Sequence, residues 1–332
     1  MNDIPTYADV LAAAERIAGP AVRTPLIHSP LLSERVGGRV FLKAETLQRT
    51  GSFKFRGAYN TVKALGPEAG GIVACSSGNH AQGVAEAARL AGLPATIVMP
   101  SDAPAVKRAR TEGFGARVVL YDRASEDRDE VAGTVLAEAG GAMVHPYNDP
   151  RVIAGQGTAG LEIAEDLERA GVTPEVVLVP CSGGGLTAGL TLALTEHFPE
   201  VAIYGVEPAG FDDYARSLAA GRPVRNARLA GSICDALLSP EPGPIGFAIN
   251  RERLAGALSV SDEEALHAVG FAYEALRLIV EPGGAAALAA LLQGRIDFAG
   301  RTVVVVLSGG NVGDEILAEA VAAYRSEAAR AA

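Results

Sequence analysis

Short apolar runs alternate with alanine-rich amphipathic stretches over residues 70–145. The apolar runs are rich in β-branched residues and predict strands at 71–76, 95–100, 116–121 and 142–146. The stretches between them predict helices at 80–92, 106–113 and 129–141, each ending at a glycine. Strands that alternate with helices in this way form a parallel α/β unit.

A second series of the same kind occupies the C-terminal half of the chain. Strands are predicted at 175–180, 201–208 and 302–310. Helices are predicted at 158–171, 186–198, 262–277 and 283–294, with a terminal helix after Asp314. The pattern between 209 and about 255 is less regular. The second series therefore predicts a second α/β unit.

The two series together predict an α/β fold with two open parallel sheets. No internal repeat and no low-complexity linker separates them. We expect two closely packed domains, a small one at 50–145 inserted into a large one made of 1–49 and 146–332. Open parallel sheets bind ligands at the carboxyl ends of their strands, so the loops that follow the strands are the candidate site.

Composition limits the class of partner. The chain has 332 residues, 48% of them apolar, and a net charge of -10 without any basic cluster. That charge argues against nucleic acid and anionic membranes, which leaves a small molecule as the expected partner. No segment approaches the roughly 20 apolar residues of a membrane span, and the N-terminus lacks the features of a secretory signal. We therefore expect a cytoplasmic protein.

The cysteines give no evidence for a disulfide framework or a metal site. Cys75, Cys181 and Cys234 are far apart and odd in number. We expect buried thiols.

One lysine has unusual neighbours. Lys54 stands between Phe53 and Phe55. An amine in apolar surroundings loses hydration of its charged form, so its pKa falls and the free base can form a Schiff base with an aldehyde such as pyridoxal phosphate. The alternative is a lysine that extends its charged end out of an apolar patch.

A glycine-rich loop follows the strand predicted at 175–180 and precedes a helix. In the run Cys181 to Leu186, Ser182 is followed by three adjacent glycines, so bare backbone N–H groups would converge at a helix N-terminus, where phosphate binds. A flexible turn is one alternative. A nicotinamide-cofactor fingerprint with Glu207 as the ribose-binding acid is another, although Gly189 stands one place late for GxGxxG.

Two further loops carry polar side chains after predicted strands. Ser76, Ser77, Asn79 and His80 stand where a helix begins, and their donors would stabilise a substrate carboxylate there. Simple N-capping by Ser77 or Asn79 is the alternative, and His80 is expected to be structural. The loop after the last strand contains Ser308, whose hydroxyl could meet a ring nitrogen.

Taken in order, these segments resemble the fold-type II pyridoxal-phosphate enzymes, specifically the threonine/serine dehydratase and serine racemase family. The resemblance covers nearly the whole chain and implies the architecture of the tryptophan synthase β subunit. It is carried by the segments Arg23 to Leu26, Ser52 to Ala58, Ser76 to His80, His145 to Pro150, Val152 to Thr158, Ser182 to Leu186, Glu281 to Ala285 and Ser308 to Asn311.

The resemblance implies roles around the cofactor. Lys54 would carry pyridoxal phosphate as a Schiff base and Phe53 would pack against its ring. Asn79 would bond the ring hydroxyl, and Ser308 would face the pyridine nitrogen. The phosphate would be held by the segment Ser182, Gly183, Gly184, Gly185 and Leu186.

It also implies the reaction. Lys54 would remove the α-proton of L-threonine or L-serine and the β-hydroxyl would leave, giving a 2-oxo acid and ammonia. Serine racemase and 3-hydroxyaspartate dehydratase activities are alternatives within the family. Ser77 resembles the serine of those two groups, which exchanges a proton on the ring face opposite the lysine. Tyr147 instead resembles the aromatic residue of the dehydratases.

Two residues bear on the substrate. Arg128 falls near an arginine that reaches the active site in serine racemases and could read a second carboxylate, such as that of 3-hydroxyaspartate. A surface position is the alternative. Ser239 would line the pocket.

The last implied features are a metal site and a dimer. Glu207 and Asp213 would supply carboxylates and Phe211 a backbone carbonyl to Mg²⁺ or Ca²⁺, which bind oxygen ligands. A solvated pair of acids is the alternative. The family also implies a homodimer.

Overall fold

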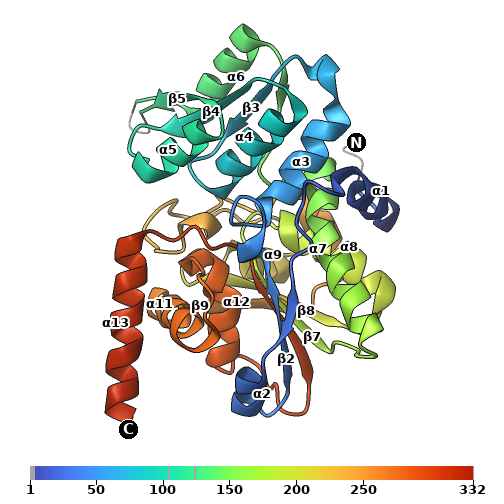
Figure 1. Cartoon of the computed structure of the whole chain (residues 1–332), viewed down its shortest axis with the longest axis vertical. Helices are drawn as coiled ribbons and strands as arrows, with labels where there is room; N and C mark the ends of the chain where they lie inside the picture. Colours follow the sequence, from blue (N-terminus) through green and yellow to red (C-terminus); the bar gives the residue numbers. More distant parts are fainter. Residues whose placement is uncertain (1–3, 104, 123–124, 332) are drawn as a thin grey trace.

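A computed structural model of the chain describes residues 4–103, 105–122 and 125–331. Within them the strands form a six-stranded and a four-stranded sheet, which lie in the lower and upper parts of the molecule in Figure 1. Two parallel-sheet α/β domains are therefore confirmed, while their boundaries at 49/50 and 145/146 stay a prediction. In the described part of the chain, no helix has the length and apolar character needed to cross a membrane.

The large sheet has the order β1-β2-β10-β7-β8-β9. All its neighbouring strands are parallel except the edge strand β1, which runs antiparallel to β2. The strands are β1 (Leu26–His28), β2 (Arg39–Ala44), β7 (Val176–Pro180), β8 (Ala202–Pro208), β9 (Gly256–Val260) and β10 (Thr302–Leu307).

Helices cover both faces of this sheet, which explains its uninterrupted apolar strands. Along β10, Val303 and Val305 belong to the core under α11 and α12, whereas Val304 and Val306 belong to the core under α7 and α8. Figure 1 shows these pairs of helices on opposite sides of the sheet, with α13 along the outside. The helices are α7 (Pro150–Arg169), α8 (Gly185–His197), α11 (Asp262–Phe271), α12 (Pro282–Leu292) and α13 (Asp314–Ala331).

The small sheet has the order β5-β4-β3-β6 and is parallel throughout. Ile97 and Met99 of β4 face the core under α3 and α4, and Val98 faces the core under α6. The strands are β3 (Ile72–Cys75), β4 (Ala95–Pro100), β5 (Arg117–Tyr121) and β6 (Ala142–Met143). The helices are α3 (Lys54–Leu65), α4 (Asn79–Ala91), α5 (Ala105–Gly113) and α6 (Arg128–Ala139).

The sequence pattern located most of these strands and helices and missed or misplaced others. Helix α7 begins at Pro150 rather than 158, because the Asp149 carboxylate caps its first N–H groups. The stretch predicted as helix to 277 leaves the α-helix at Phe271 and continues as a π-turn over Ala272–Leu276. Elements without a prediction are α1 (Tyr7–Ile17), α2 (Pro30–Val36), α9 (Asp213–Ala220), α10 (Pro244–Asn250), β1, β2, α3 and β9.

The prediction of three buried thiols is wrong for one of them. Cys181 and Cys234 are buried, but Cys75 is half-buried because it ends β3 at a cavity.

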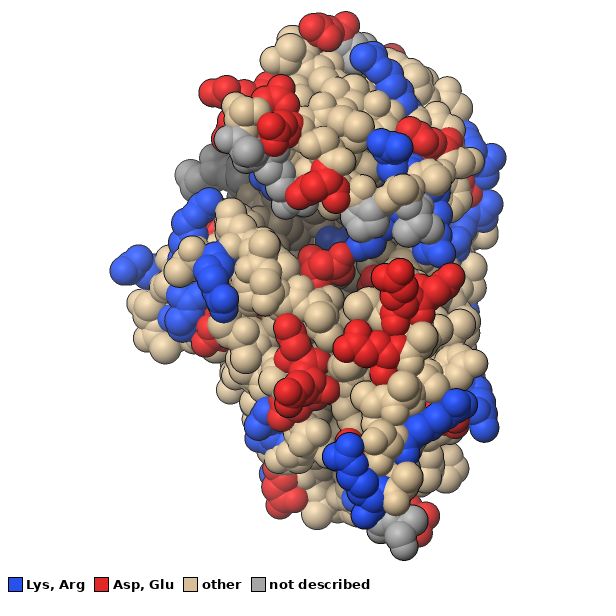
Figure 2. All heavy atoms as spheres, turned by 90° about the vertical axis from the view of Figure 1, so that its left-hand side faces the viewer, with Lys and Arg blue, Asp and Glu red and all other residues tan. Residues whose placement is uncertain are grey.

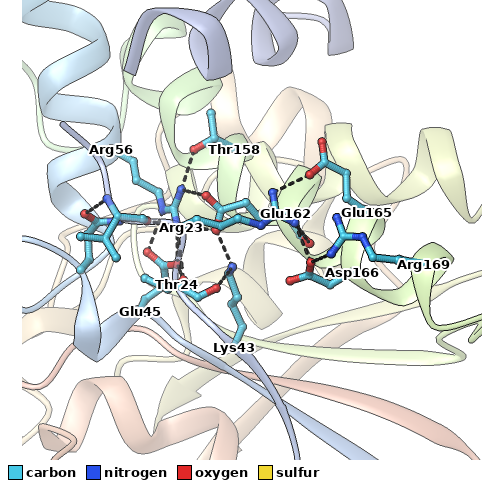
Figure 3. A network of polar contacts seen from close by, with 12 residues as sticks. Arg23, Thr24, Lys43, Glu45, Arg56, Thr158, Glu162, Glu165, Asp166 and Arg169 are labelled. Atoms are coloured by element: carbon cyan, nitrogen blue, oxygen red, sulfur yellow. Dashed lines mark hydrogen bonds and ion pairs between the residues drawn. The ribbon is translucent and has the colours of Figure 1, made fainter. Parts of the chain in front are cut away.

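A buried network of charges joins the two parts of the molecule beside Lys54 (Figure 3). The Arg56 guanidinium donates to both oxygens of Glu45, at 2.8 Å each, and to both oxygens of Glu162, at 2.7 and 2.8 Å. Lys43 Nζ lies 2.5 Å from Glu162 Oε2. Burial alone would raise the pKa of Glu45, but the Arg56 charge holds it below its ordinary value. Two cations thus balance two carboxylates between β2, α3 and α7.

Replacing Arg56 by methionine should destabilise the fold strongly. Arg56 and Glu45 are both fully buried, so Arg56→Met leaves a carboxylate without its main counter-charge. Breaking a buried pair in this way costs about 3–5 kcal/mol. Urea unfolding would measure the loss.

Arg169→Met is the matched control at the exposed end of the same network. Arg169 pairs with Asp166 at 2.9 Å but its side chain is 69% exposed. Exposed pairs contribute about 0–1 kcal/mol. Equal losses from the two substitutions would contradict the structural role of Arg56.

Candidate active site

A cavity of about 590 Å³ lies where loops from both sheets meet. Figure 2 shows a hollow between the upper and lower parts of the molecule, with Lys or Arg side chains inside it. The residues that sequence analysis assigned to a cofactor or a substrate all line this one cavity. They are Phe53, Lys54, Ser76, Ser77, Asn79, His80, Arg128, Ser182, Gly183, Gly184, Gly185, Leu186, Ser239 and Ser308.

Lys54 is the first residue of α3 and presents its amine to the cavity. Its Nζ donates to the carbonyl of Pro146 at 2.8 Å and lies 5.2 Å from the centre of the Phe53 ring. Among the ion pairs of the described residues, none joins Lys54 to a carboxylate. Burial therefore lowers the pKa of the amine from 10.5 to about 8. About a tenth of the amine is therefore uncharged at pH 7.

The glycine loop approaches its neighbours so closely that side chains are excluded. A Cβ at Gly183 would collide with the Tyr147 ring, and one at Gly184 would collide with the Tyr214 hydroxyl. Gly184 also has φ of +84° and precedes the first turn of α8. Bare N–H groups at the start of a 13-residue helix are a suitable place for a phosphate.

The loop before α4 is built to offer donors. Gly78 N–H donates to Ser76 Oγ at 3.2 Å, which shapes the turn, and α4 begins at Asn79.

Burial and the nearby Lys54 charge lower the pKa of His80 to about 3, so its ring is neutral. Its Nε2 lies 2.9 Å from the Val144 carbonyl and must carry the proton. The buried Nδ1 is then an acceptor, and His80 can serve a carboxylate only through its backbone N–H.

Ser308 and Ser239 close the lower wall. Ser308 follows β10 and is 5% exposed, and its carbonyl accepts from the Phe53 N–H at 3.1 Å. This bond ties the lysine segment to the end of the large sheet. Ser182 Oγ donates to Ser239 Oγ at 2.7 Å, which links the glycine loop to the loop before α10.

Three charged residues of the cavity wall were not assigned a site role from the sequence. Glu281 Oε1 accepts from Asn79 Nδ2 at 2.5 Å. Lys107 of α5 and Asp235, in the short 3-10 helix Asp235–Leu237, form an ion pair in the cavity wall. Glu281 belongs to one of the segments that carry the family resemblance, whereas only the fold brings Lys107 and Asp235 to the cavity.

The three residues expected to bind a metal lie outside the cavity wall. Glu207 accepts from the N–H groups of Tyr214 and Ala215 at 2.7 and 2.9 Å. Asp213 Oδ1 accepts from Asn226, and its Oδ2 is buried without a partner. Over the described residues, no group of three or more His, Cys, Asp or Glu side chains is arranged to hold a metal.

Comparison with known proteins decides the family. The model of the family described as pyridoxal-phosphate dependent enzyme matches residues 17–309. The chain belongs to this family. This family assignment excludes the nicotinamide alternative, and Glu207, the ribose-binding acid expected for it, does not line the cavity.

Relatives with different printed activities are similar to nearly the whole chain. An L-threo-3-hydroxyaspartate ammonia-lyase of Saccharomyces cerevisiae is 41% identical over 93% of this chain and 94% of its own length. An L-threonine ammonia-lyase of Thermotoga maritima is 41% identical over 92% of this chain and 76% of its own. The solved structure of maize serine racemase has a TM-score of 0.90 at 34% identity, covering 98% of this chain and 100% of that one.

Gly184→Ala should damage both the fold and the cavity. The backbone at Gly184 has a positive φ, which is strained for any residue with a Cβ, and the added methyl group would collide with the Tyr214 hydroxyl. We expect a loss of about 2–5 kcal/mol in unfolding free energy, from left-handed strain and overpacking. We also expect at least a roughly tenfold weaker affinity for pyridoxal phosphate, measured by visible absorbance.

Gly171→Ala provides the control for backbone strain alone. Gly171 has φ of +65° but nothing within 4 Å of an added Cβ. It should cost about 1–2 kcal/mol and leave cofactor affinity unchanged. Unchanged cofactor affinity in Gly184→Ala would contradict a phosphate site at this loop.

Proposed function

We propose that this protein is a pyridoxal-phosphate-dependent ammonia-lyase that acts on small β-hydroxy amino acids, with 3-hydroxyaspartate as the preferred substrate. The family assignment supports the cofactor. The observation that carries the substrate is that Arg128 lines the same cavity as Lys54.

The residues present fit the cofactor. Lys54 offers an amine of lowered pKa, the glycine loop at the start of α8 lines the cavity, and Ser308 is a buried hydroxyl at the end of β10. Lys54 would bind the aldehyde, the loop from Ser182 to Leu186 the phosphate, Asn79 the ring oxygen and Ser308 the ring nitrogen. Phe53 would pack against the ring. Bound pyridoxal phosphate supplies an electron sink for the charge left at the α-carbon.

The protein's own groups then move the protons. Lys54 Nζ removes the α-proton, for which a pKa of about 8 is suitable near neutral pH. The substrate α-carboxylate would be held by Ser76, Ser77 and the first N–H groups of α4. The β-hydroxyl leaves, and hydrolysis yields a 2-oxo acid and ammonia.

Arg128 would read the second carboxylate of the substrate. It begins α6 at the mouth of the cavity and is exposed. Its charge nevertheless acts on Tyr147: burial raises the pKa of the Tyr147 phenol, and Arg128 opposes the rise. Because the Tyr147 ring lies against Gly183, the electrostatic effect of the Arg128 guanidinium extends to the glycine loop. Arginine binds carboxylates with two parallel hydrogen bonds.

L-Threonine and L-serine are the second candidates. Ala132 and Leu136 of α6, with Val98 of β4, give one wall of the cavity an apolar surface that suits a methyl group. A threonine ammonia-lyase is also among the similar proteins.

Release of 2-oxo acid from the three substrates tests both candidates. Arg128→Met should lower kcat/KM for L-threo-3-hydroxyaspartate about 10- to 100-fold, the effect of losing a charge-assisted hydrogen bond. The values for L-threonine and L-serine should change less than about threefold, because neither has a second carboxylate.

Arg151→Met is a matched control at an arginine outside the cavity wall, paired with Asp149 at 2.9 Å. It should leave all three rates near those of the unaltered protein. A wild-type enzyme that prefers threonine, with no selective effect of Arg128→Met, would overturn the preference for hydroxyaspartate.

Ser77 would exchange a proton on the substrate face opposite Lys54. Ser77 lines the cavity with Lys54. We expect Ser77→Ala to lower formation of D-serine from L-serine about 100-fold or more, the usual contribution of a positioned acid or base. Elimination should stay within about fivefold. Equal loss of both activities, measured by chiral chromatography and 2-oxo acid release, would contradict this role.

A divalent cation at Glu207, Asp213 and the Phe211 carbonyl is a further part of the proposal. The buried, unpartnered Oδ2 of Asp213 supports it. Removing bound Mg²⁺ or Ca²⁺ with a chelator should lower the melting temperature by about 4 °C, if the ion is present at about 100 times its Kd. In Asp213→Asn, the chelator should have no effect, and a melting temperature unaffected by chelation in the unaltered protein would remove the metal from the proposal.

The homodimer and the cytoplasmic location also stay predictions. Sedimentation of the purified protein would test the dimer.

A further inference from the structure

Glu281 lies in the cavity wall without a part in the function proposed above. It is the N-cap residue of α12 and is 4% exposed. Its backbone N–H donates to the Gly309 carbonyl at 3.0 Å, and a Cβ at Gly309 would collide with Glu281 Oε1. Gly309 therefore makes room for this carboxyl beside Asn79, whose Nδ2 lies 2.5 Å from Oε1.

A chain of hydrogen bonds determines how the Asn79 amide is turned. It begins at the Thr50 carbonyl, which can only accept, and which accepts from Asn311 Nδ2 at 2.8 Å. The same nitrogen donates to Asn79 Oδ1 at 2.7 Å. The Asn79 oxygen therefore faces Asn311, and its nitrogen must face Glu281.

The partner of the Asn79 nitrogen must then be an acceptor. An amide nitrogen carries two hydrogens. Glu281 Oε1 takes one of them, and the second is available to a group bound in the cavity. An apolar residue at 281 would leave the Asn79 nitrogen free to turn away from that group.

We propose that Glu281 is a positioning residue, which as an acceptor holds Asn79 so that one N–H points to the ring oxygen of the cofactor. This inference rests on the proposed role of Asn79. It assigns to Glu281 an effect on cofactor binding that is exerted through Asn79 alone.

The charges around Glu281 make this effect depend on pH. Burial and the negative charge of Asp235 raise the pKa of Glu281 to about 7, against the Asn79 hydrogen bond and the positive charge of Lys107. These groups come from the three elements beside it, the 3-10 helix at 235–237, α4 and α5. Below pH 7 the carboxyl is mostly neutral and above it mostly ionised. An ionised acceptor is the stronger one, so Asn79 is held better as pH rises from 6 to 8.

Equilibrium dialysis of the apo-protein against pyridoxal phosphate tests the proposal at pH 6 and pH 8. Glu281→Ala should weaken cofactor affinity about tenfold at pH 8, because Asn79 loses its acceptor. Glu281→Gln keeps an acceptor oxygen and should lose less than about threefold. Titration of Lys54 changes cofactor affinity with pH in every variant, so the test compares variants. The affinity for pyridoxal phosphate should rise less from pH 6 to pH 8 in Glu281→Gln than in the unaltered protein.

Two further variants make the result specific. Glu264→Gln is the same chemical change in the capping box of α11, away from the cavity, and should leave cofactor affinity unchanged. Asn311→Ala removes the donor that turns Asn79 and should weaken affinity as Glu281→Ala does, which also covers the case in which Glu281→Ala does not fold.

Cofactor affinity that is unchanged in both Glu281→Ala and Asn311→Ala would overturn the inference. A loss of cofactor affinity in Glu281→Gln as large as in Glu281→Ala would also overturn the inference, because the glutamine keeps an acceptor oxygen for Asn79. These readouts do not depend on turnover. A protein that releases no 2-oxo acid from any substrate tested would refute the proposed function and leave the role of Glu281 measurable.

Discussion

The buried ion network around Arg56 is the constraint on which the site depends. Arg56 stands two residues after Lys54 on the first turn of α3, and its guanidinium is held by Glu45, next to β2, and by Glu162 of α7. A guanidinium bonded to two carboxylates has little freedom to move without breaking several charge-assisted hydrogen bonds. The start of α3, and with it the Lys54 amine, is therefore fixed to the large sheet although α3 also packs on α4. The cost of burying these two cations and two carboxylates is offset by their mutual pairing. The pairing also fixes the position of Lys54.

Parallel strands bring the rest of the site to the same place. The loops after β3, β7 and β10 carry Asn79, the glycine loop and Ser308, and all three line one cavity. Close backbone contacts then hold these loops together: Phe53 N–H donates to the Ser308 carbonyl, and Gly284 of α12 lets the loop after β10 lie directly against that helix. These glycines allow close packing: a methyl group at Gly184 would collide with Tyr214, and one at Gly309 would collide with Glu281.

The sequence predicted the parts of this arrangement that depend on local pattern. Periodic apolar runs placed the central strands, and polar or glycine-rich loops after them identified Asn79, Ser182 and Ser308 as candidates. Elements with weak local signals were missed, such as the short α10 and the edge strand β9, because packing against their neighbours defines them. Glu281 lies in one of the segments that carry the family resemblance, but the sequence predicted no role for it. Its function depends on which way the Asn79 amide is turned, and that is set by Thr50 and Asn311, which are distant in sequence from both.

The two acidic groups of the cavity wall, Asp235 and Glu281, have partners other than Lys54 among the described residues. A carboxylate beside Lys54 would hold its amine in the charged form and raise its pKa. Asp235 and Glu281 both line the cavity, yet Asp235 pairs with Lys107 and Glu281 is bonded to Asn79. With both acids committed elsewhere, burial is the dominant influence on Lys54 and lowers its pKa to about 8. Arg128 also lines the cavity but is exposed, where solvent keeps a guanidinium ionised at little cost. The cavity wall thus combines a buried amine of lowered pKa with an exposed guanidinium.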